Sequence, residues 1–345
     1  MEDMTLGQMD KLIIHFVGNK NNGDGVRFSD NLTNFEDIEQ YFKKLVESNF
    51  KLEELFSFYS LPKIELNPMY QFISSIFEDN NSFVEQSQNS ARYLYDKSIH
   101  PQIKVGELLM VYFKNCKIGE ELADAIGIFK SENKDTVLKV CSSNDSFNLK
   151  DEKGMNINKL DKGCLIFNVQ KENGYLIAVV DNNNRSTEAQ YWKEHFLNVQ
   201  PIKNDFHQTQ QFLGIAKQFV TKQLTDDFNI TKADQIDYLN RSVDYFKNNE
   251  KFDKQEFEKK VFEDDSLIAS FQNFDKIFRK DNEIAPSENF EISDKAVKKQ
   301  ARVFKSVLKL DKNFHIYIHG DKKLIENGTD ERGRKFYKIY YEEEK

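Results

Sequence analysis

The architecture of the N-terminal part is best read from Lys162-Gly-Cys-Leu-Ile-Phe-Asn-Val-Gln-Lys-Glu-Asn-Gly-Tyr-Leu-Ile-Ala-Val-Val-Asp181. Two apolar, β-rich runs, 165–169 and 175–180, are separated by the turn-forming triplet 172–174. Such a short link favours a hairpin, because parallel strands need a crossover of a dozen or more residues. The segment therefore predicts an antiparallel sheet.

Further strands and helices are expected around this hairpin. Apolar runs that resemble these two strands lie at 108–113, 125–129 and 136–140. An Asn/Gly-rich turn separates two further β-rich runs, 12–17 and 26–32, which predict an opening hairpin. Helical spacing of apolar residues predicts helix within 35–59 and again over about 70–99. We expect residues 1–204 to form an α+β domain with a mostly antiparallel sheet.

Two further parts are expected after residue 204. Residues 205–285 show two apolar stripes at helical spacing and predict a helical middle region, whose mixed charges are typical of a solvated face. Pro286 lies in a loop-like segment, 283–289. A basic helix and a β-hairpin are expected over 286–345.

Composition indicates a globular, cytoplasmic protein. Hydrophobic residues make up 39% and charged residues 31% of the 345 residues, which excludes disordered and collagen-like chains. No apolar run approaches the roughly 18 residues of a membrane span. Cys116, Cys141 and Cys164 are odd in number and include no Cys-x-x-Cys, so neither a disulfide framework nor a zinc site is expected.

Charge is distributed unevenly along the chain. The total is −8, which argues against a protein that coats polyanions over its whole surface. Residues 286–345 hold 14 Lys and Arg against 11 Asp and Glu, so they carry +3 and residues 1–285 carry −11. Positive charge is therefore concentrated near the C-terminus.

The segment Lys295-Ala-Val-Lys-Lys-Gln-Ala-Arg-Val-Phe-Lys-Ser-Val-Leu-Lys-Leu310 contains six basic residues and no acid. Steps of three and four place five of the six on one face of a predicted helix. DNA phosphates would offset the repulsion between these cations, but a solvated amphipathic face explains them equally well. An anionic membrane ranks below DNA, because no aromatic anchors flank the basic face. The predicted phosphate contacts on this helix are Lys295, Lys298, Lys299, Arg302, Lys305 and Lys309.

The C-terminal hairpin extends the basic surface. Its basic residues alternate with tyrosines, a pattern that suits nucleic-acid contact but is also ordinary in strands. His315 and His319 would lie roughly 13 Å apart in a strand, so no metal site is expected. The predicted contacts here are Arg332, Arg334, Lys335 and Lys338.

Catalysis finds little support in the sequence. The chain has no phosphate loop, no Gly-x-Gly-x-x-Gly and no Gly-x-Ser-x-Gly, and we expect no cofactor and no catalytic residues. Asp181 follows a predicted strand and would be a Mg²⁺ ligand in a nuclease. A turn formed by Asp181 and the asparagines after it is the simpler interpretation.

The chain resembles the NdpA-like family of bacterial nucleoid-associated proteins, in a form like that of Bacteroidetes. The resemblance covers most of the chain and is carried by four segments: Lys11-Leu-Ile-Ile-His-Phe-Val-Gly18, the strands of 162–168 and 174–181, Tyr191-Trp-Lys-Glu-His-Phe-Leu197, and Val307-Leu-Lys-Leu-Asp-Lys-Asn-Phe-His-Ile-Tyr-Ile-His-Gly320. It implies a cytoplasmic protein of the bacterial nucleoid that associates with DNA, without known enzymatic activity.

The leading hypothesis is a non-enzymatic protein that binds duplex DNA largely without sequence specificity. A second hypothesis is a protein-interaction module that other nucleoid proteins recruit to DNA, and a metal-dependent nuclease is the weakest. Phe-rich helices suit a core or a dimer interface equally, so the sequence does not decide whether the protein forms a homo-oligomer.

Overall fold

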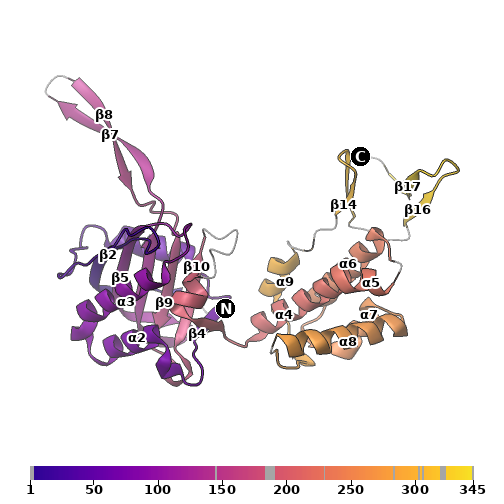
Figure 1. Ribbon diagram of the computed structural model, residues 1–345, viewed down its shortest axis with the longest axis horizontal. Helices are drawn as coiled ribbons and strands as arrows, with labels where there is room; N and C mark the ends of the chain where they lie inside the picture. The colour runs from indigo at the N-terminus through magenta and orange to yellow at the C-terminus, as the bar shows by residue number, and fades with distance from the viewer. Residues whose placement is uncertain are drawn as a thin grey trace. The chain divides into compact units, whose positions relative to one another are not determined.

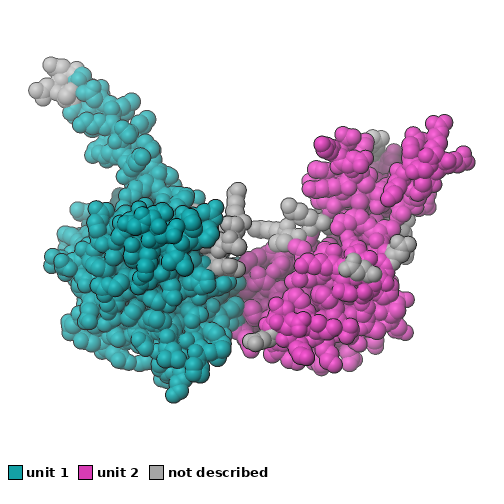
Figure 2. All heavy atoms as spheres, viewed as in Figure 1, with its two compact units in different colours: residues 1–202 teal, residues 203–345 magenta. Residues whose placement is uncertain are grey.

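The computed structural model describes residues 4–143, 146–182, 191–228, 230–282, 284–301, 304, 307–318 and 324–343, without the side chains of Ser143 and Asp226. The chain divides into two compact units, residues 1–202 and 203–345 (Figure 2). The expected three-part division stays a prediction, and each unit is described below by itself. None of the described helices is long and apolar enough to cross a membrane.

Unit 1 contains a large sheet, helices on it and a separate hairpin (Figure 1). Its strands are β1 (Met4–Thr5), β2 (Gln8–Val17), β3 (Val26–Arg27), β4 (Leu55–Phe58), β5 (Gly106–Ile118), β6 (Glu121–Ser131), β7 (Asp135–Ser143), β8 (Ser146–Gly154), β9 (Lys162–Phe167), β10 (Leu176–Asp181) and β11 (Val199–Pro201). Its helices are α1 (Glu39–Asn49), α2 (Pro68–Glu78), α3 (Phe83–Lys97) and a π-helix (Tyr191–Leu197), with 3-10 turns at Ile64–Leu66, Asn80–Ser82 and Lys171–Asn173.

The large sheet is antiparallel throughout. Its order is β11-β4-β10-β9-β6-β5-β2-β3, and β1 also pairs with β5. The predicted β9–β10 hairpin is confirmed, with Gly174 at a φ of 93° in its turn. A Cβ on Gly174 would lie 2.4 Å from the carbonyl oxygen of Phe58, so both conformation and space require glycine.

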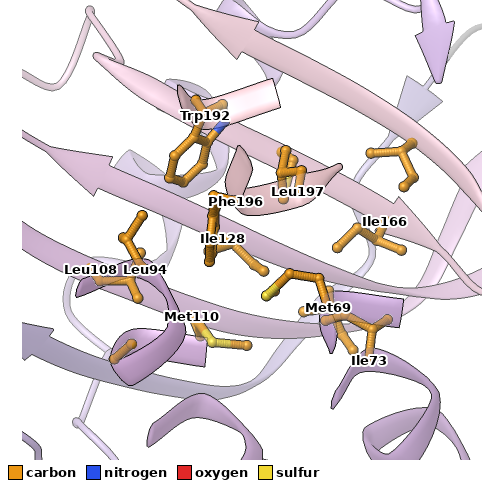
Figure 3. Close-up of a cluster of buried hydrophobic side chains, with 14 of the residues drawn as sticks. Met69, Ile73, Leu94, Leu108, Met110, Ile128, Ile166, Trp192, Phe196 and Leu197 are labelled. Carbon is orange, nitrogen blue, oxygen red and sulfur yellow. The ribbon is translucent and has the colours of Figure 1, made fainter. Parts of the chain in front are cut away.

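The sheet is buried on both faces, which explains why its central strands are continuous apolar runs. In β5, Leu108 and Met110 point to one core, whereas Leu109 and Val111 point to the other. The first core is covered by α2, α3 and the π-helix, as Figure 3 shows for Met69, Ile73, Leu94, Trp192 and Phe196. The second core is covered by α1, through Phe42, Leu45 and Val46.

Three sequence predictions for unit 1 need correction. The helix expected within 35–59 ends at Asn49, and Leu55–Phe58 forms β4, whose four residues are all buried by pairing with β10 and β11. The helix expected over 70–99 is two helices, α2 and α3, separated by the turn Asn80–Ser82. The second strand of the opening hairpin is only two residues long, at Val26–Arg27.

The strand expected at 136–140 is β7, but it does not join the large sheet. It pairs with β8 in a two-stranded hairpin, here called the arm, which extends away from the body of unit 1 (Figure 1). The sequence predicts no strand at the position of β8, because its residues are mostly polar.

Unit 2 is mainly helical and ends in two hairpins (Figure 1). Its helices are α4 (Asp205–Gln218), a π-helix (Phe219–Gln223), α5 (Leu224–Asp227), α6 (Lys232–Asn248), α7 (Lys254–Val261), α8 (Asp265–Asp281) and α9 (Asp294–Ala301). Its strands are β12 (Lys251–Asp253), β13 (Asn289–Glu291), β14 (Val307–Leu310), β15 (Phe314–Tyr317), β16 (Ile325–Thr329) and β17 (Lys335–Ile339).

A phenylalanine-rich core holds unit 2 together. Phe212, Phe246 and Phe271 are at most 1% exposed, and Val297 of α9 belongs to the same core. The middle region is not wholly helical, because β12 pairs with β13 and so ties residues 251–253 to the segment that precedes α9. The expected C-terminal part thus packs against the expected middle region.

Candidate nucleic-acid interface

Helix α9 presents part of the predicted basic face. Ser293 begins it, with its Oγ accepting a hydrogen bond from the backbone N–H of Ala296 at 3.4 Å. Ala296 and Val297 are buried in unit 2, which turns Lys298 and Lys299 outward as exposed side chains. The Lys299 ammonium lies 5.4 Å from the ring centroid of Phe206. Lys295, one turn earlier, is half-buried.

The expected single helix over 295–310 is wrong, because α9 ends at Ala301 and residues 307–310 form strand β14. Arg302 and Lys305 lie outside the described residues. The sequence Val307-Leu-Lys-Leu310 alternates as a strand does, and pairing with β15 overrides the helical spacing. Asp311, at a φ of 51°, supplies the turn between the strands. Lys309 therefore does not continue the helix face.

Two hairpins follow α9 where the sequence predicted one. Leu308 is 2% and Ile318 7% exposed, and both pack on Ile236 of α6. The Asn240 side chain also donates to the carbonyl oxygen of Ile318 at 3.3 Å. The β14–β15 hairpin thus covers α6 with one face, and Lys309, directly opposite His315, lies on its other face.

The side chains on that other face form a groove of about 960 Å³ together with side chains of α6. We call it the cationic groove, because three lysines and a histidine line it with a single acid, Asp244. Its lining residues are Lys232, Asn240, Val243, Asp244, Lys247, Ala301, Phe304, Val307, Lys309, His315 and Tyr317.

The charges of the cationic groove are only partly compensated. Lys247 lies 3.4 Å from Asp244, but both side chains are more than half exposed, so this ion pair is weak. Lys232 donates to the side-chain oxygen of Gln235 at 2.8 Å and keeps its full charge. Lys309 forms no ion pair with any acid in the part of the chain that the structure describes. The groove therefore offers a favourable site for an anion.

The predicted cations of the last hairpin, β16–β17, are all exposed. Arg334 pairs with Asp330 at 2.8 Å, and Lys338 lies 3.7 Å from Glu326 and 4.7 Å from the ring centroid of Tyr340. Arg332 and Lys335 are exposed without an ion pair to a described acid. The hairpin therefore adds less free positive charge than its sequence suggests.

Asp181, the candidate magnesium ligand, lies in a buried ion pair. Its carboxylate is 2.6 Å from the Lys162 ammonium, and each side chain is 3% exposed. Lys162 also lies 5.3 Å from the ring centroid of Tyr191. Among the described residues, no three His, Cys, Asp or Glu side chains are placed to hold a metal ion. The expected turn after Asp181 lies largely outside the described residues, as does His319.

Sequence reasoning missed Lys232, Lys247 and Tyr317 as members of a common site. Lys232 and Lys247 lie in α6, far along the chain from Lys309, and only the docking of β14–β15 on that helix brings them together. The turn chemistry of 311–313 was the one signal that could have revealed the hairpin and hence the groove.

Comparison with known proteins identifies the family. No curated protein matches the chain. A family model described as nucleoid-associated protein YejK matches residues 13–335, which cover most of each unit and all the residues that line the cationic groove. Because this match covers nearly the whole sequence, the chain belongs to that family of nucleoid-associated proteins.

Proposed function

We propose that the protein binds duplex DNA through its phosphate backbone, using the cationic groove and the outer face of α9, and that it does so without catalysis. The observation that carries the proposal is the groove, which Lys232 and Lys247 of α6 line together with Lys309 of β14. The proposed contacts are these three lysines together with Lys295, Lys298, Lys299, Arg302, Lys305, Arg332, Arg334, Lys335 and Lys338.

The groove's size and chemistry suit a phosphate backbone better than base edges. About 960 Å³ accommodates a strand of backbone but not a whole duplex, so the rest of the DNA would lie over the neighbouring surface. Lysines are point charges that position phosphates without reading sequence. Binding should therefore be largely independent of sequence and should weaken as salt rises, because bound phosphates release counterions.

The test is the salt dependence of duplex binding, measured by fluorescence anisotropy. Lys247→Gln/Lys309→Gln removes two groove cations and should weaken binding at moderate salt at least about tenfold. The slope of log affinity against log salt should become shallower by about 1.8, because each lost phosphate contact accounts for about 0.9.

The matched control is Lys251→Gln/Lys260→Gln, which removes the same charge from the same unit. Both control lysines are exposed and pair with acids outside the groove, Lys251 with Glu291 at 2.9 Å and Lys260 with Glu256 at 2.7 Å. An equal loss in control and groove variant would show a general charge effect and would remove the groove from the interface. Absence of binding by the intact chain at low salt would reject direct DNA binding.

Recruitment by another nucleoid protein is the second candidate, favoured by the charge of −11 on residues 1–285. It predicts that purified protein fails to bind duplex at any salt concentration but co-purifies with a DNA-binding partner. The same anisotropy series therefore separates the two candidates.

A further inference from the structure

The arm of unit 1 exposes an apolar surface that plays no part in the proposed DNA contacts. Cross-strand pairing places Leu138, Val140, Phe147 and Leu149 on one side of the β7–β8 ribbon. They are 66%, 63%, 79% and 66% exposed, respectively. We call these four residues the apolar face of the arm.

The arm contributes nothing to the cores of unit 1. Apart from Cys141 and Gly154, every arm residue whose side chain is described is exposed. The ribbon pairs with no third strand in the described chain, and isolated two-stranded ribbons are marginally stable in water. A ribbon with one apolar side is therefore better explained by a surface that covers it than by the fold of unit 1.

Charge distinguishes the candidate occupants of this surface. Residues 135–154 contain three lysines and four acids, a net charge of −1. Ribbons that enter DNA grooves need a cationic surface to meet phosphates, whereas the net charge of this ribbon is negative and its Lys139 pairs with Glu152 at 3.1 Å. A second copy of the chain meets little repulsion at the arm, although the chain as a whole carries −8.

We propose that the apolar face pairs with the apolar face of the arm in a second copy of the chain. A two-fold axis along the ribbon places Val140 of one copy over Leu149 of the other. It also brings Asp151 diagonal to Lys153 of the other copy, because both lie on this side of the ribbon at its base. The same axis places Asp151 over Leu138 of the other copy, so the pairing is apolar at Val140 and Leu149 and charged at the base of the ribbon.

The size of the apolar face sets the strength of the pairing. Strands of nine residues span about 30 Å, so one side of the ribbon buries on the order of 300 Å² per copy. Stable complexes bury about 800 Å² per partner. The arms should therefore form a dimer that dissociates on dilution rather than an obligate one.

The test variant is Val140→Glu/Leu149→Lys in the full chain. Val140 and Leu149 are directly opposite, so the new side chains form a cross-strand pair that supports the ribbon while removing the apolar face. The control, Cys141→Glu/Asn148→Lys, introduces the same residues at the neighbouring cross-strand pair on the other side. Neither variant changes the net charge, and neither touches a core, so thermal unfolding should match the parent protein.

Sedimentation velocity over about 1 to 100 μM, the range expected for a weak dimer, provides the readout. The parent and the control should shift from 40.6 kDa toward twice that mass as concentration rises. The test variant should raise the dimer dissociation constant at least about tenfold.

The native thiols allow a direct second measurement. Cys116 and Cys164 are buried and burial raises the pKa of both thiols, so a nitroxide reagent should label Cys141 selectively. Dipolar spectroscopy should then show a short distance between labels in the parent and none in Val140→Glu/Leu149→Lys.

Two results would overturn the proposal: a parent that is monomeric at every concentration, or equal dimerisation of the parent and both variants. A monomeric parent would also be tested for whether the test substitutions lower its affinity for DNA or for lipid vesicles. Such a loss of affinity would assign the arm to that other ligand.

Discussion

His15 lies in β2, only 1% exposed, between two hydrogen-bonding partners. Its Nδ1 accepts from the backbone N–H of Ser29 at 3.1 Å, so its Nε2 carries the proton and donates to Ser87 Oγ at 2.9 Å. Ser87 in turn donates to the carbonyl oxygen of Val84 at 2.7 Å. A protonated imidazole would direct a second N–H at the N–H of Ser29, so this site requires neutral histidine.

Stability should therefore fall on acidification. Burial lowers the pKa of His15 from 6.5 to about 4, so between these values the unfolded chain binds a proton that the folded chain does not. The associated loss of unfolding free energy begins near pH 6.5 and reaches about 3 kcal/mol near pH 4. Urea denaturation at a series of pH values measures it.

His15→Gln is the comparison, because glutamine also donates and accepts but does not titrate in this range. Titrating carboxylates affect both proteins, so the difference between the two pH profiles isolates His15. Parallel profiles from pH 7 to pH 4 would show that His15 does not titrate as described.

At the scale of elements, the cationic groove depends on a small apolar cluster and one hydrogen bond, from Asn240 to Ile318. Leu308 of β14 packs with Ile318 on Ile236 of α6, in a cluster separate from the main core of unit 2. The hairpin that positions Lys309 and His315 is therefore held less firmly than the helices beneath it.

Leu308→Ala should detach this hairpin without changing any charge. Truncation of a buried leucine costs about 2–5 kcal/mol, and here the loss falls on the hairpin rather than on the core. Amide hydrogen exchange should accelerate within 307–317 and stay unchanged in α4 and α8, while DNA affinity falls. Phe314→Ala, which truncates a 63% exposed side chain in the same hairpin, should leave both measurements unchanged.

Elements with strong local patterns were predictable from sequence. The apolar runs of β5, β6, β9 and β10 identified the antiparallel sheet, because burial on both faces demands continuous hydrophobicity. The sequence does not predict β4, because its strand character comes from pairing with β10 and β11, which are distant in sequence. It does not predict β14, because the apolar residues of that segment also have helical spacing, which masks the turn that follows. β8 was missed because an exposed strand needs no apolar pattern.

At the scale of the molecule, the family predicted from four segments is confirmed by a match over residues 13–335. Membership places the protein at the nucleoid, in the cytoplasm, and in association with DNA. The Bacteroidetes-type form and the ten individual contact residues stay predictions. Apart from the turn at 311–313, no local motif could reveal the groove, because its lysines come from α6 and from the hairpin that covers it.

The separate cores predict that DNA binding belongs to unit 2 alone. The aromatic core of residues 203–345 includes no residue of unit 1, so this fragment should fold independently. It should retain the salt slope of the full chain in the anisotropy assay, whereas residues 1–202 should not bind. A folded fragment, verified by circular dichroism, that lacks affinity for DNA would contradict this assignment.

Pairing at the arms would also determine how many DNA sites one assembly can hold. Arm and groove belong to different units, so two chains joined at their arms would carry two grooves and would be bivalent. Once one groove is occupied, the second meets nearby DNA at a high effective concentration. The residence time on long DNA would then rise steeply with protein concentration, whereas the residence time on a short oligonucleotide would not. A weak association between chains would thus make the avidity for long DNA depend on the amount of protein present.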